Sequence, residues 1–392
     1  MHPLKGLTII DLTSVVAGPF ATQLLVQQGA RVLKIEPPEG DRARMLGVVG
    51  VPQFSSAHAF LNSGKESVGL DLGKEDGVRI LKQLTSGADV MVHNFRPGVM
   101  DRLGFGVEVL HALNPSLVIA RISGFGQDGP CHGERAYDPI LQAESGMAIR
   151  DDSGVPHLLP QYICDKTAGL YAAQAVSAAL VERERSGRGS VVDISMLEAA
   201  VAFGWIDVHS RETFQVPAPP STIGAVYRPW ATRDGWLVIV MLSQVEFEGW
   251  ARAVGAEQLL EDPRFSDMQS RFQNWGALRE FGEKKLGELT TSEAAARLRS
   301  AGVPCGVARL SSDLHSHEQI AADRFLATHD HGKTGPTTLP LPVARFNSLR
   351  QPPALHAPAI GEHTRAVLMQ FGFTHRQIDA AFASGTTHSK EA

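Results

Sequence analysis

The chain has 392 residues, of which 43% are hydrophobic and 20% are charged, a composition that is ordinary for a globular protein and large enough for two domains. The formal net charge of −5 and the lack of a basic run interleaved with aromatic residues argue against nucleic-acid binding. No run reaches the roughly 20 apolar residues of a membrane-spanning helix, and the first residues lack a signal-peptide core. We therefore expect a cytoplasmic protein without membrane contacts.

Strands and helices alternate along the first 200 residues. Short apolar runs predict strands at residues 7–12, 31–35, 67–72, 89–95 and 117–124. Helical periodicity predicts helices at 19–28, 74–86 and near 107–113. Strands joined through helices form parallel sheets, so this pattern predicts a doubly wound, Rossmann-like α/β fold.

A second, smaller α/β domain is expected later in the chain. A clear helix is predicted over residues 166–184, with small residues on one face, and a strand VVDI follows it. Pro, Gly and Ser are then frequent over residues 216–229. We predict a large domain of residues 1–205 and 315–392, a linker at 206–234 and a small domain at 235–314. The tail closes with an amphipathic helix.

The glycines of residues 124–129 (GFGQDG) match the dinucleotide-binding pattern GxGxxG after a strand. That pattern binds a pyrophosphate only where a helix starts at the glycines. Here a proline follows without helical periodicity, so we interpret the segment as a tight turn. The three cysteines are widely spaced and odd in number, so we expect no disulfide framework. The histidines do not have the spacing of metal ligands, so we expect no metal site.

Asp165 stands between a polar segment and the predicted helix, and two interpretations remain open at this point. As an N-cap of a helix beginning at Lys166, its carboxylate would accept a backbone N–H. As a nucleophile, it would attack a thioester carbonyl while the helix dipole keeps it ionised. Cys164 beside it has no histidine placed to activate it, which favours a buried structural cysteine.

Several segments resemble, in order and spacing, the class III CoA-transferases, also called the CaiB/BaiF family, including formyl-CoA transferase-like and dicarboxylate CoA-transferase-like members. They are residues 3–41, 65–77, 88–106 (ADVMVHNFRPGVMDRLGFG), 114–130, the D-x-x-x-G of Asp165 with the downstream RSGRG turn, AGVPCGV and GEHT. The resemblance covers nearly the whole chain. It implies an interlocked homodimer of ring-like subunits, with coenzyme A or acyl-CoA as a substrate rather than a permanently bound cofactor.

The resemblance also implies that Asp165 is the nucleophile of an acyl transfer that passes through an aspartyl anhydride and an aspartyl-CoA thioester. Some members of the family instead racemise 2-methylacyl-CoA, which needs a second acid–base group, expected as a histidine before an aspartate. This chain has Tyr137 there, and His132 five residues earlier falls in a predicted loop. The tyrosine in place of histidine therefore favours transfer. Tyr137 could donate a hydrogen bond near the thioester or be a half-buried tyrosine before a turn, and both interpretations stay open here. A non-catalytic CoA-binding protein is a third hypothesis, disfavoured by the intact Asp165.

The resemblance implies CoA contacts at the ends of three predicted strands and in two turns. These residues are Val15, Val16, Ala17, Leu70, Asp71, Leu72, Gly73, Asn94, Phe95, Arg96, Arg102 and Arg135. Guanidinium groups suit phosphate oxygens because they donate two parallel hydrogen bonds. After the second predicted strand, where some relatives have an arginine for the adenine or the 3′-phosphate of CoA, this chain has Pro37. Arg42 could replace it or face solvent, and for Arg44 a solvated position is expected.

Few residues of the sequence indicate which carboxylic acid is the acceptor. Tyr227 and Arg228, with Gly224 before them, are predicted to bind a second carboxylate, which favours a small dicarboxylate such as succinate, itaconate, malate or mesaconate. Residues 221–227 could form a lid that shields an anhydride from water. The expected enzyme moves CoA from succinyl-CoA or another dicarboxylyl-CoA to a carboxylic acid.

Overall fold

The computed structural model describes residues 2–150, 153–214, 227–350 and 356–389. The chain forms two compact units, Met1–His209 with Arg324–Ala392, and Ser210–Asp323. The first unit is built on a seven-stranded sheet in the order β10-β7-β6-β1-β2-β5-β16. Its strands are β1 (Thr8–Leu12), β2 (Arg31–Glu36), β5 (Glu66–Leu70), β6 (Val90–His93), β7 (Val118–Ser123), β10 (Val191–Ser195) and β16 (Thr387–His388).

The large sheet is parallel except for β16, which pairs antiparallel with β5. From β1 the chain builds outward through β2 to β5, and it then returns to the other side of β1 with β6, β7 and β10. The predicted doubly wound fold is confirmed, as are the predicted strands that make up this sheet. In such sheets ligands bind at the carboxyl ends of the strands where the order reverses, which here is between β1 and β6.

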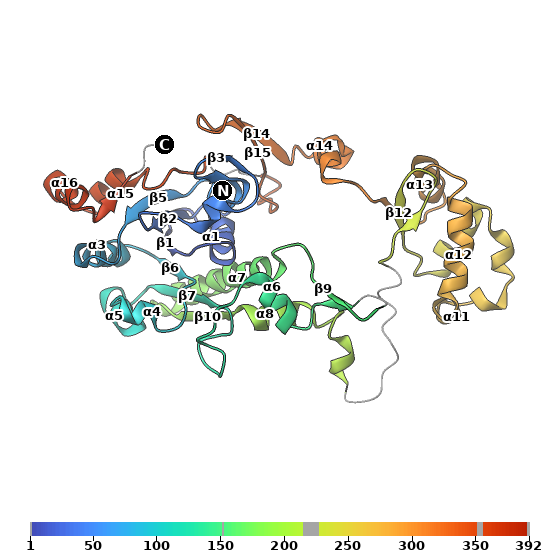
Figure 1. Cartoon of the computed structure of the whole chain (residues 1–392), viewed down its shortest axis with the longest axis horizontal. Helices are drawn as coiled ribbons and strands as arrows, with labels where there is room; N and C mark the ends of the chain where they lie inside the picture. Colours follow the sequence, from blue (N-terminus) through green and yellow to red (C-terminus); the bar gives the residue numbers. More distant parts are fainter. Residues whose placement is uncertain (1, 151–152, 215–226, 351–355, 390–392) are drawn as a thin grey trace. The chain divides into compact units, whose positions relative to one another are not determined.

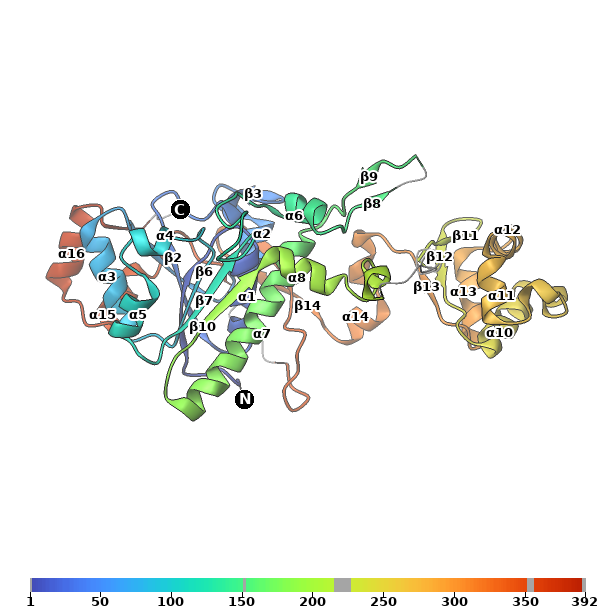
Figure 2. The same cartoon turned by 90° about the horizontal axis from the view of Figure 1, so that it is seen from below.

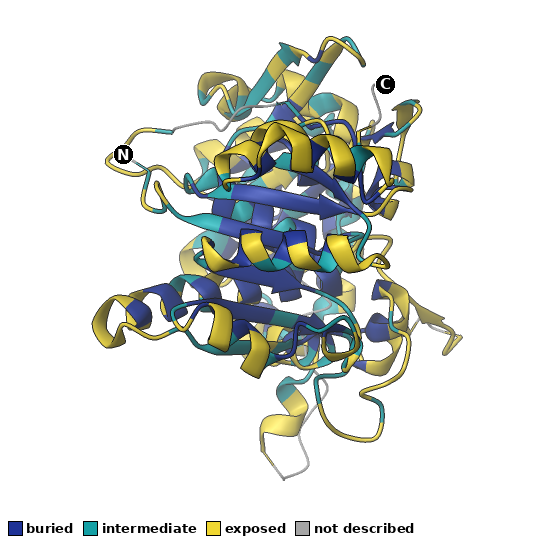
Figure 3. Cartoon of the chain, turned by 90° about the vertical axis from the view of Figure 1, so that its left-hand side faces the viewer, coloured by how far each residue is buried: buried dark blue, intermediate teal, exposed yellow. Residues whose placement is uncertain are grey.

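Helices cover both faces of the sheet, as the views in Figures 1 and 2 show. Alternate residues of one strand point to opposite faces, so Ile9 belongs to one core and Ile10 to the other. One face is packed by α1 (Ala17–Gln27), α7 (Ile163–Ser186) and α8 (Met196–Phe203). The other face is packed by α3 (Glu75–Ser86), α4 (Val99–Arg102), α5 (Val107–Leu113), α15 (Thr364–Gln370) and α16 (His375–Ala383). Figure 3 shows the strands as a buried layer between helices whose outer sides are exposed.

The remaining elements of the first unit are short. They are α2 (Ser56–Leu61), α6 (Asp138–Glu144), the 3-10 turn η1 (Arg42–Met45) and three small hairpins, β3 (Val49–Val51) with β4 (Phe54–Ser55), β8 (Ile149–Arg150) with β9 (Pro156–His157), and β14 (Leu326–Asp330) with β15 (Pro336–Pro340). The GxGxxG segment forms turns in which Gly126 and Gly129 have positive φ, and the next helix starts only at Asp138. The predicted tight turn is therefore confirmed.

The second unit packs helices against a small antiparallel sheet. Its elements are η2 (Ser210–Thr213), β11 (Trp230–Ala231), β12 (Trp236–Ile239), α10 (Gln244–Val254), η3 (Glu257–Leu260), η4 (Pro263–Phe265), α11 (Met268–Gln273), α12 (Trp275–Leu286), α13 (Thr291–Ser300), β13 (Cys305–Val307), η5 (Ser311–Ser316) and α14 (Glu318–Ala322). Trp230 is fully buried in its core against Trp250. Residues 230–234 thus belong to this unit, although the sequence placed them in a linker at 206–234. None of the described helices has the length and apolar content needed to cross a membrane.

Gly169 lets helices α1 and α7 approach each other closely. A Cβ atom added at Gly169 would lie 2.8 Å from the Ala17 carbonyl oxygen and 2.9 Å from the ring of Phe20. Backbone atoms cannot yield as a flexible side-chain end can, so any larger residue would separate the two helices. Gly169 lies one helical turn after Asp165, and the close packing therefore fixes the start of α1 beside that carboxyl group.

We expect Gly169→Ala to destabilise the protein by about 1–3 kcal/mol, because overpacking outweighs the gain in helix propensity. Urea unfolding would measure the change. Gly276→Ala is the matched control, since a Cβ in this helix meets no atom within 4 Å. The control should be neutral or stabilised by up to about 1 kcal/mol. Equal effects of the two substitutions would contradict the packing argument.

Candidate active site

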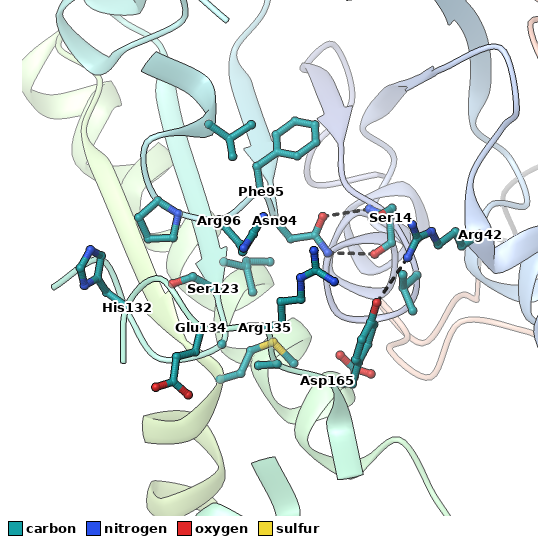
Figure 4. A pocket seen from close by; sticks show the side chains of 18 residues that line it. Ser14, Arg42, Asn94, Phe95, Arg96, Ser123, His132, Glu134, Arg135 and Asp165 are labelled. Carbon is teal, nitrogen blue, oxygen red and sulfur yellow. Dashed lines mark hydrogen bonds between the residues drawn. The ribbon is translucent and has the colours of Figure 1, made fainter. Parts of the chain in front are cut away.

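A pocket of about 460 Å³ opens where the strand order reverses, at the carboxyl ends of β1, β6 and β7 (Figure 4). All of its lining residues belong to the first unit. They are Ser14, Val15, Arg42, Asn94, Phe95, Arg96, Pro97, Val99, Ile122, Ser123, Gly124, His132, Glu134, Arg135, Ala136, Tyr137, Asp165 and Met196. The pocket therefore combines a buried carboxyl group with three guanidinium groups, at the position where doubly wound folds bind ligands.

Asp165 lies in the first turn of α7 and is 8% exposed. Helix α7 begins at Ile163 with Tyr162 in the capping position, so the prediction that Asp165 caps a helix starting at Lys166 is wrong. The cap comes from elsewhere in the chain: the Asp138 carboxylate accepts the Asp165 backbone N–H at 3.0 Å. The Asp165 side chain is consequently free to face the pocket.

The protonation of Asp165 also differs from the expectation. Burial, followed by the negative charge of Asp138, raises the pKa of Asp165 to about 7, although a hydrogen bond from the backbone of Ala17 acts in the opposite direction. The helix dipole therefore does not keep this carboxyl group fully ionised at neutral pH, because desolvation is the larger effect. A carboxyl group with such a pKa is a stronger base and nucleophile than an exposed aspartate.

The loop between β1 and α1 is held from two sides. Asn94, at the end of β6, accepts the Ser14 N–H at 2.9 Å and donates to the Ser14 carbonyl at 2.8 Å. Asp41 accepts the Val15 N–H at 2.9 Å and pairs with Lys34 at 2.7 Å. Val15 has a φ of 71°, which is strained for a β-branched residue and persists only because its surroundings impose it. The start of α1, including Ala17, is thereby positioned beside Asp165.

Two arginines near this loop have opposite environments. Arg42 lines the pocket, and its Nη1 donates to the Tyr137 hydroxyl at 3.3 Å. Arg44 is 1% exposed and forms a two-pronged ion pair with Glu36 at 2.9 and 2.7 Å. The expected solvated position of Arg44 is therefore wrong, because Glu36 at the end of β2 supplies a buried partner.

The structure brings together only some of the predicted CoA contacts. Val15, Asn94, Phe95, Arg96 and Arg135 line the pocket with Tyr137 and Asp165. Val16 and Ala17 are buried at the start of α1. Leu70 ends β5, two strands away from β1, and residues 71–73 follow it. Arg102 is exposed on α4. Neither of these last two sets is part of the pocket lining.

The predicted substrate residues Tyr227 and Arg228 are not among the first-unit residues that line this pocket. Tyr227 and Arg228 are exposed residues of the second unit. Gly224 and nearly all of the predicted lid at 221–227 lie outside the described residues. Cys164 is fully buried, and burial, with the charges of Asp138 and Asp165, raises the pKa of its thiol to about 12, as suits a structural cysteine.

Sequence reasoning missed several residues of the pocket. Asp138 was read only as the neighbour of Tyr137, and His132 only as a loop residue, yet Asp138 caps α7 and His132 lines the pocket. The other unforeseen lining residues include Ser14, Ser123 and Glu134. Asp138 carried one usable signal, because an aspartate directly before a proline often starts a helix. Within the described ranges, no group of three or more His, Cys, Asp or Glu side chains is arranged to hold a metal ion.

The model of CoA-transferase family III matches residues 4–364, which is most of the chain. The chain belongs to this family. It is 34% identical to an acetyl-CoA:oxalate CoA-transferase of Acetobacter aceti, covering 94% of this chain and 96% of that protein. It is 29% identical to a succinyl-CoA:glutarate CoA-transferase of Mus musculus, covering 100% of this chain and 92% of the relative. A CaiB/BaiF family crystal structure from Brucella suis superposes with a TM-score of 0.82 at 27% identity, over 94% of this chain and 99% of that one.

These matches confirm the resemblance and the class of reaction. The protein is a class III CoA-transferase, with the α/β fold expected of one, and Asp165 of its D-x-x-x-G segment lies in a pocket of that fold.

The raised pKa of Asp165 predicts how the rate of its acylation depends on pH. The rate of Asp165 acylation by an acyl-CoA should rise with pH through about 7, because only the ionised carboxylate attacks. In Asp138→Asn the midpoint should move down by about one pH unit, since a neighbouring negative charge is removed. Stopped-flow acylation from pH 5 to 9 would measure it. Asp193→Asn, a carboxylate outside the pocket, should leave the profile unchanged; an unmoved midpoint in Asp138→Asn would contradict the prediction.

A second prediction concerns stability. The pKa of Asp165 is raised in the folded state, so the proton it holds stabilises the fold, and this contribution is lost as the pH rises from about 4 to about 7. Asp165→Asn should therefore be more stable than the wild type at pH 8, on the order of 1–4 kcal/mol. The difference should narrow as the pH falls toward 4. Urea unfolding of both proteins from pH 4 to pH 8 would measure their free energies of unfolding. A difference between them that does not change with pH would contradict a raised pKa of Asp165 in the folded state.

Proposed function

We propose that this CoA-transferase moves CoA from an acyl-CoA, such as succinyl-CoA or another dicarboxylyl-CoA, to a carboxylic acid such as itaconate, malate or mesaconate. The observation that carries the proposal is the placement of Asp165, a buried carboxyl group that faces the pocket at the switch point of the sheet. The other carboxyl group among the described lining residues, that of Glu134, is exposed, so Asp165 is the buried carboxylate of this pocket.

The proposed reaction proceeds in four attacks. The Asp165 carboxylate attacks the thioester carbonyl and expels CoA thiolate, which leaves an acyl–aspartyl anhydride. The thiolate then attacks the aspartyl carbonyl, releasing the donor acid and forming an aspartyl-CoA thioester. The carboxylate of the acceptor acid attacks this thioester and expels the thiolate again. In the last step the thiolate attacks the acceptor carbonyl, which yields the new acyl-CoA and restores Asp165.

The start of α1 supports this chemistry electrostatically. Each attack creates an oxyanion, which preorganised N–H groups stabilise. Helix α1 has no side-chain cap, so no side chain competes for its first N–H groups, and the hydrogen bond from Ala17 reaches the Asp165 carboxyl group. We assign the N–H groups of Val16 and Ala17 to this role, and Val15, whose N–H already donates to Asp41, to CoA binding together with them.

The remaining contacts with CoA are proposed from the family resemblance together with the pocket. Asn94, Phe95, Arg96 and Arg135 line the pocket, where the guanidinium groups suit phosphate oxygens. Leu70, Asp71, Leu72, Gly73 and Arg102 would contact parts of CoA beyond this pocket. Tyr227, Arg228 and Gly224 remain the proposed second-unit contacts with the acid.

Dicarboxylic acids are proposed as substrates because the two relatives described above are named for oxalate and glutarate. Three arginines in the pocket are consistent with an enzyme that must admit additional negative charge beside Asp165. The protein is proposed to work in the cytoplasm, where acyl-CoA is available, without a permanently bound cofactor.

An interlocked homodimer is proposed as the working state. Large apolar side chains are exposed along α7, at the end of α8 and just after it, among them Leu170, Tyr171, Phe203, Trp205 and Ile206. Exposed apolar side chains in such number are typical of protein interfaces. Light scattering that gives the mass of a single chain would overturn this part of the proposal.

Racemisation of a 2-methylacyl-CoA is the second candidate. One observation favours it: a carboxyl group whose pKa is about 7 shares the pocket with His132, and racemisation needs two acid–base groups. Exchange of solvent deuterium into the α-carbon of such a substrate would support it. Formation of an acyl-enzyme without exchange would exclude it.

The transferase mechanism predicts a covalent adduct. After incubation with succinyl-CoA, hydroxylamine should convert the aspartyl thioester to a hydroxamate on the peptide containing Asp165, detected by mass spectrometry. Asp165→Ala should lose the adduct and about 10³-fold or more of the activity. Asp138→Asn serves as the control that keeps the nucleophile and should keep the adduct. Activity that survives Asp165→Ala, with no adduct in the wild type, would refute the proposal.

A further inference from the structure

Arg42 presents a guanidinium group to the pocket without a carboxylate partner among the described residues. Its one hydrogen bond there is the 3.3 Å contact from Nη1 to the Tyr137 hydroxyl, drawn in Figure 4. Three arginines near the sheet that do not line this pocket are neutralised by carboxylates. Arg44 pairs with Glu36, Arg121 with Asp193 and Arg31 with Glu66. The positive charge of Arg42 therefore remains available to a ligand in the pocket.

The backbone of Arg42 is fixed relative to the nucleophile. Arg42 is the first residue of η1, and the preceding residue, Asp41, caps that turn by accepting the Ala43 N–H at 2.9 Å. The same Asp41 oxygen accepts the Val15 N–H at 2.9 Å, in the loop that leads to Ala17 beside Asp165. These bonds fix the backbone that carries the exposed Arg42 side chain, and the hydrogen bond to Tyr137 directs its guanidinium group toward the pocket that contains Asp165.

Tyr137 connects Arg42 to the other side of Asp165. It precedes Asp138, whose carboxylate holds the N–H of Asp165, and its half-exposed ring lies in the same pocket. The hydroxyl that accepts from Arg42 still has its own proton to donate. Together the two side chains offer N–H and O–H donors, which is the complement of a carboxylate.

We propose that Arg42, supported by Tyr137, binds the second carboxylate of a dicarboxylic substrate while the first carboxylate reacts at Asp165. Arg42 would then be a specificity-determining residue that selects acids with two carboxylates. This inference rests on the proposed CoA transfer and adds a substrate class to it. It also places the selection in the first unit, in addition to the Tyr227 and Arg228 of the second unit.

The test compares two acceptors of equal chain length, glutarate with two carboxylates and pentanoate with one. In Arg42→Gln, kcat/KM for glutarate should fall about 10- to 100-fold, mainly through KM, while the value for pentanoate changes less than about threefold. Arg42→Lys should retain part of the glutarate activity, because the charge is kept but the planar fork is lost. Arg79→Gln, an exposed arginine of α3 that removes the same charge, is the control and should behave as the wild type.

Three outcomes would overturn the inference while leaving CoA transfer intact. These are an equal loss for both acids in Arg42→Gln, no loss for either acid, or a wild type that prefers pentanoate. Loss of discrimination in Arg228→Gln with normal discrimination in Arg42→Gln would assign the role to the second unit instead. If no acyl-CoA acylates Asp165 in the wild type, the proposed function itself fails, and the inference fails with it.

Discussion

The site depends on a cluster of buried charges beneath the loop that joins β1 to α1. Lys34 pairs with Asp41, and Asp11 accepts from Lys65 at 3.0 Å and from Thr22 at 2.7 Å, all inside the protein. Burying charges is costly, and such clusters contribute more to a defined geometry than to stability. The geometry they define here is that of residues 13–17. Through Asp41 the cluster imposes the strained conformation of Val15, and the chain enters α1 with the Ala17 N–H directed at Asp165.

Two opposing requirements meet at Asp165. The proposed mechanism passes through an anhydride and needs a site without water, since water would hydrolyse this intermediate. Excluding water, however, raises the free energy of the ionised Asp165 carboxylate. The close packing at Gly169 satisfies the first requirement by placing α1 against α7. The Ala17 hydrogen bond meets the second only in part, because the charge of Asp138 opposes it. The result is a carboxyl group that changes its protonation near neutral pH.

Much of the fold could be read from the sequence, because hydrophobic periodicity is local. The strands that surround β1 and the long helix after Asp165 were predicted, although the helix begins three residues earlier than expected. Interactions between residues that lie far apart in the sequence could not be predicted in this way. Arg44 looked solvated because nothing in its own segment shows that Glu36 would be buried beside it. Asp165 looked like a cap because its true capping partner, Asp138, lies 27 residues away in the sequence.

The family motif singled out Asp165 as the proposed nucleophile, but the charge balance of the pocket became visible only in three dimensions. An enzyme that exchanges carboxylates must bring an anion next to Asp165 and Asp138, which repel it. Arg42, Arg96 and Arg135 reach the same pocket from three separate segments, so their charges combine only once the sheet has formed. Racemisation and group transfer both bring a polyanionic CoA thioester to this pocket, but only group transfer also brings a free acid, whose negative charge adds to the need for guanidinium groups. The distribution of charge around Asp165 therefore favours group transfer over racemisation, independently of the residue at position 137.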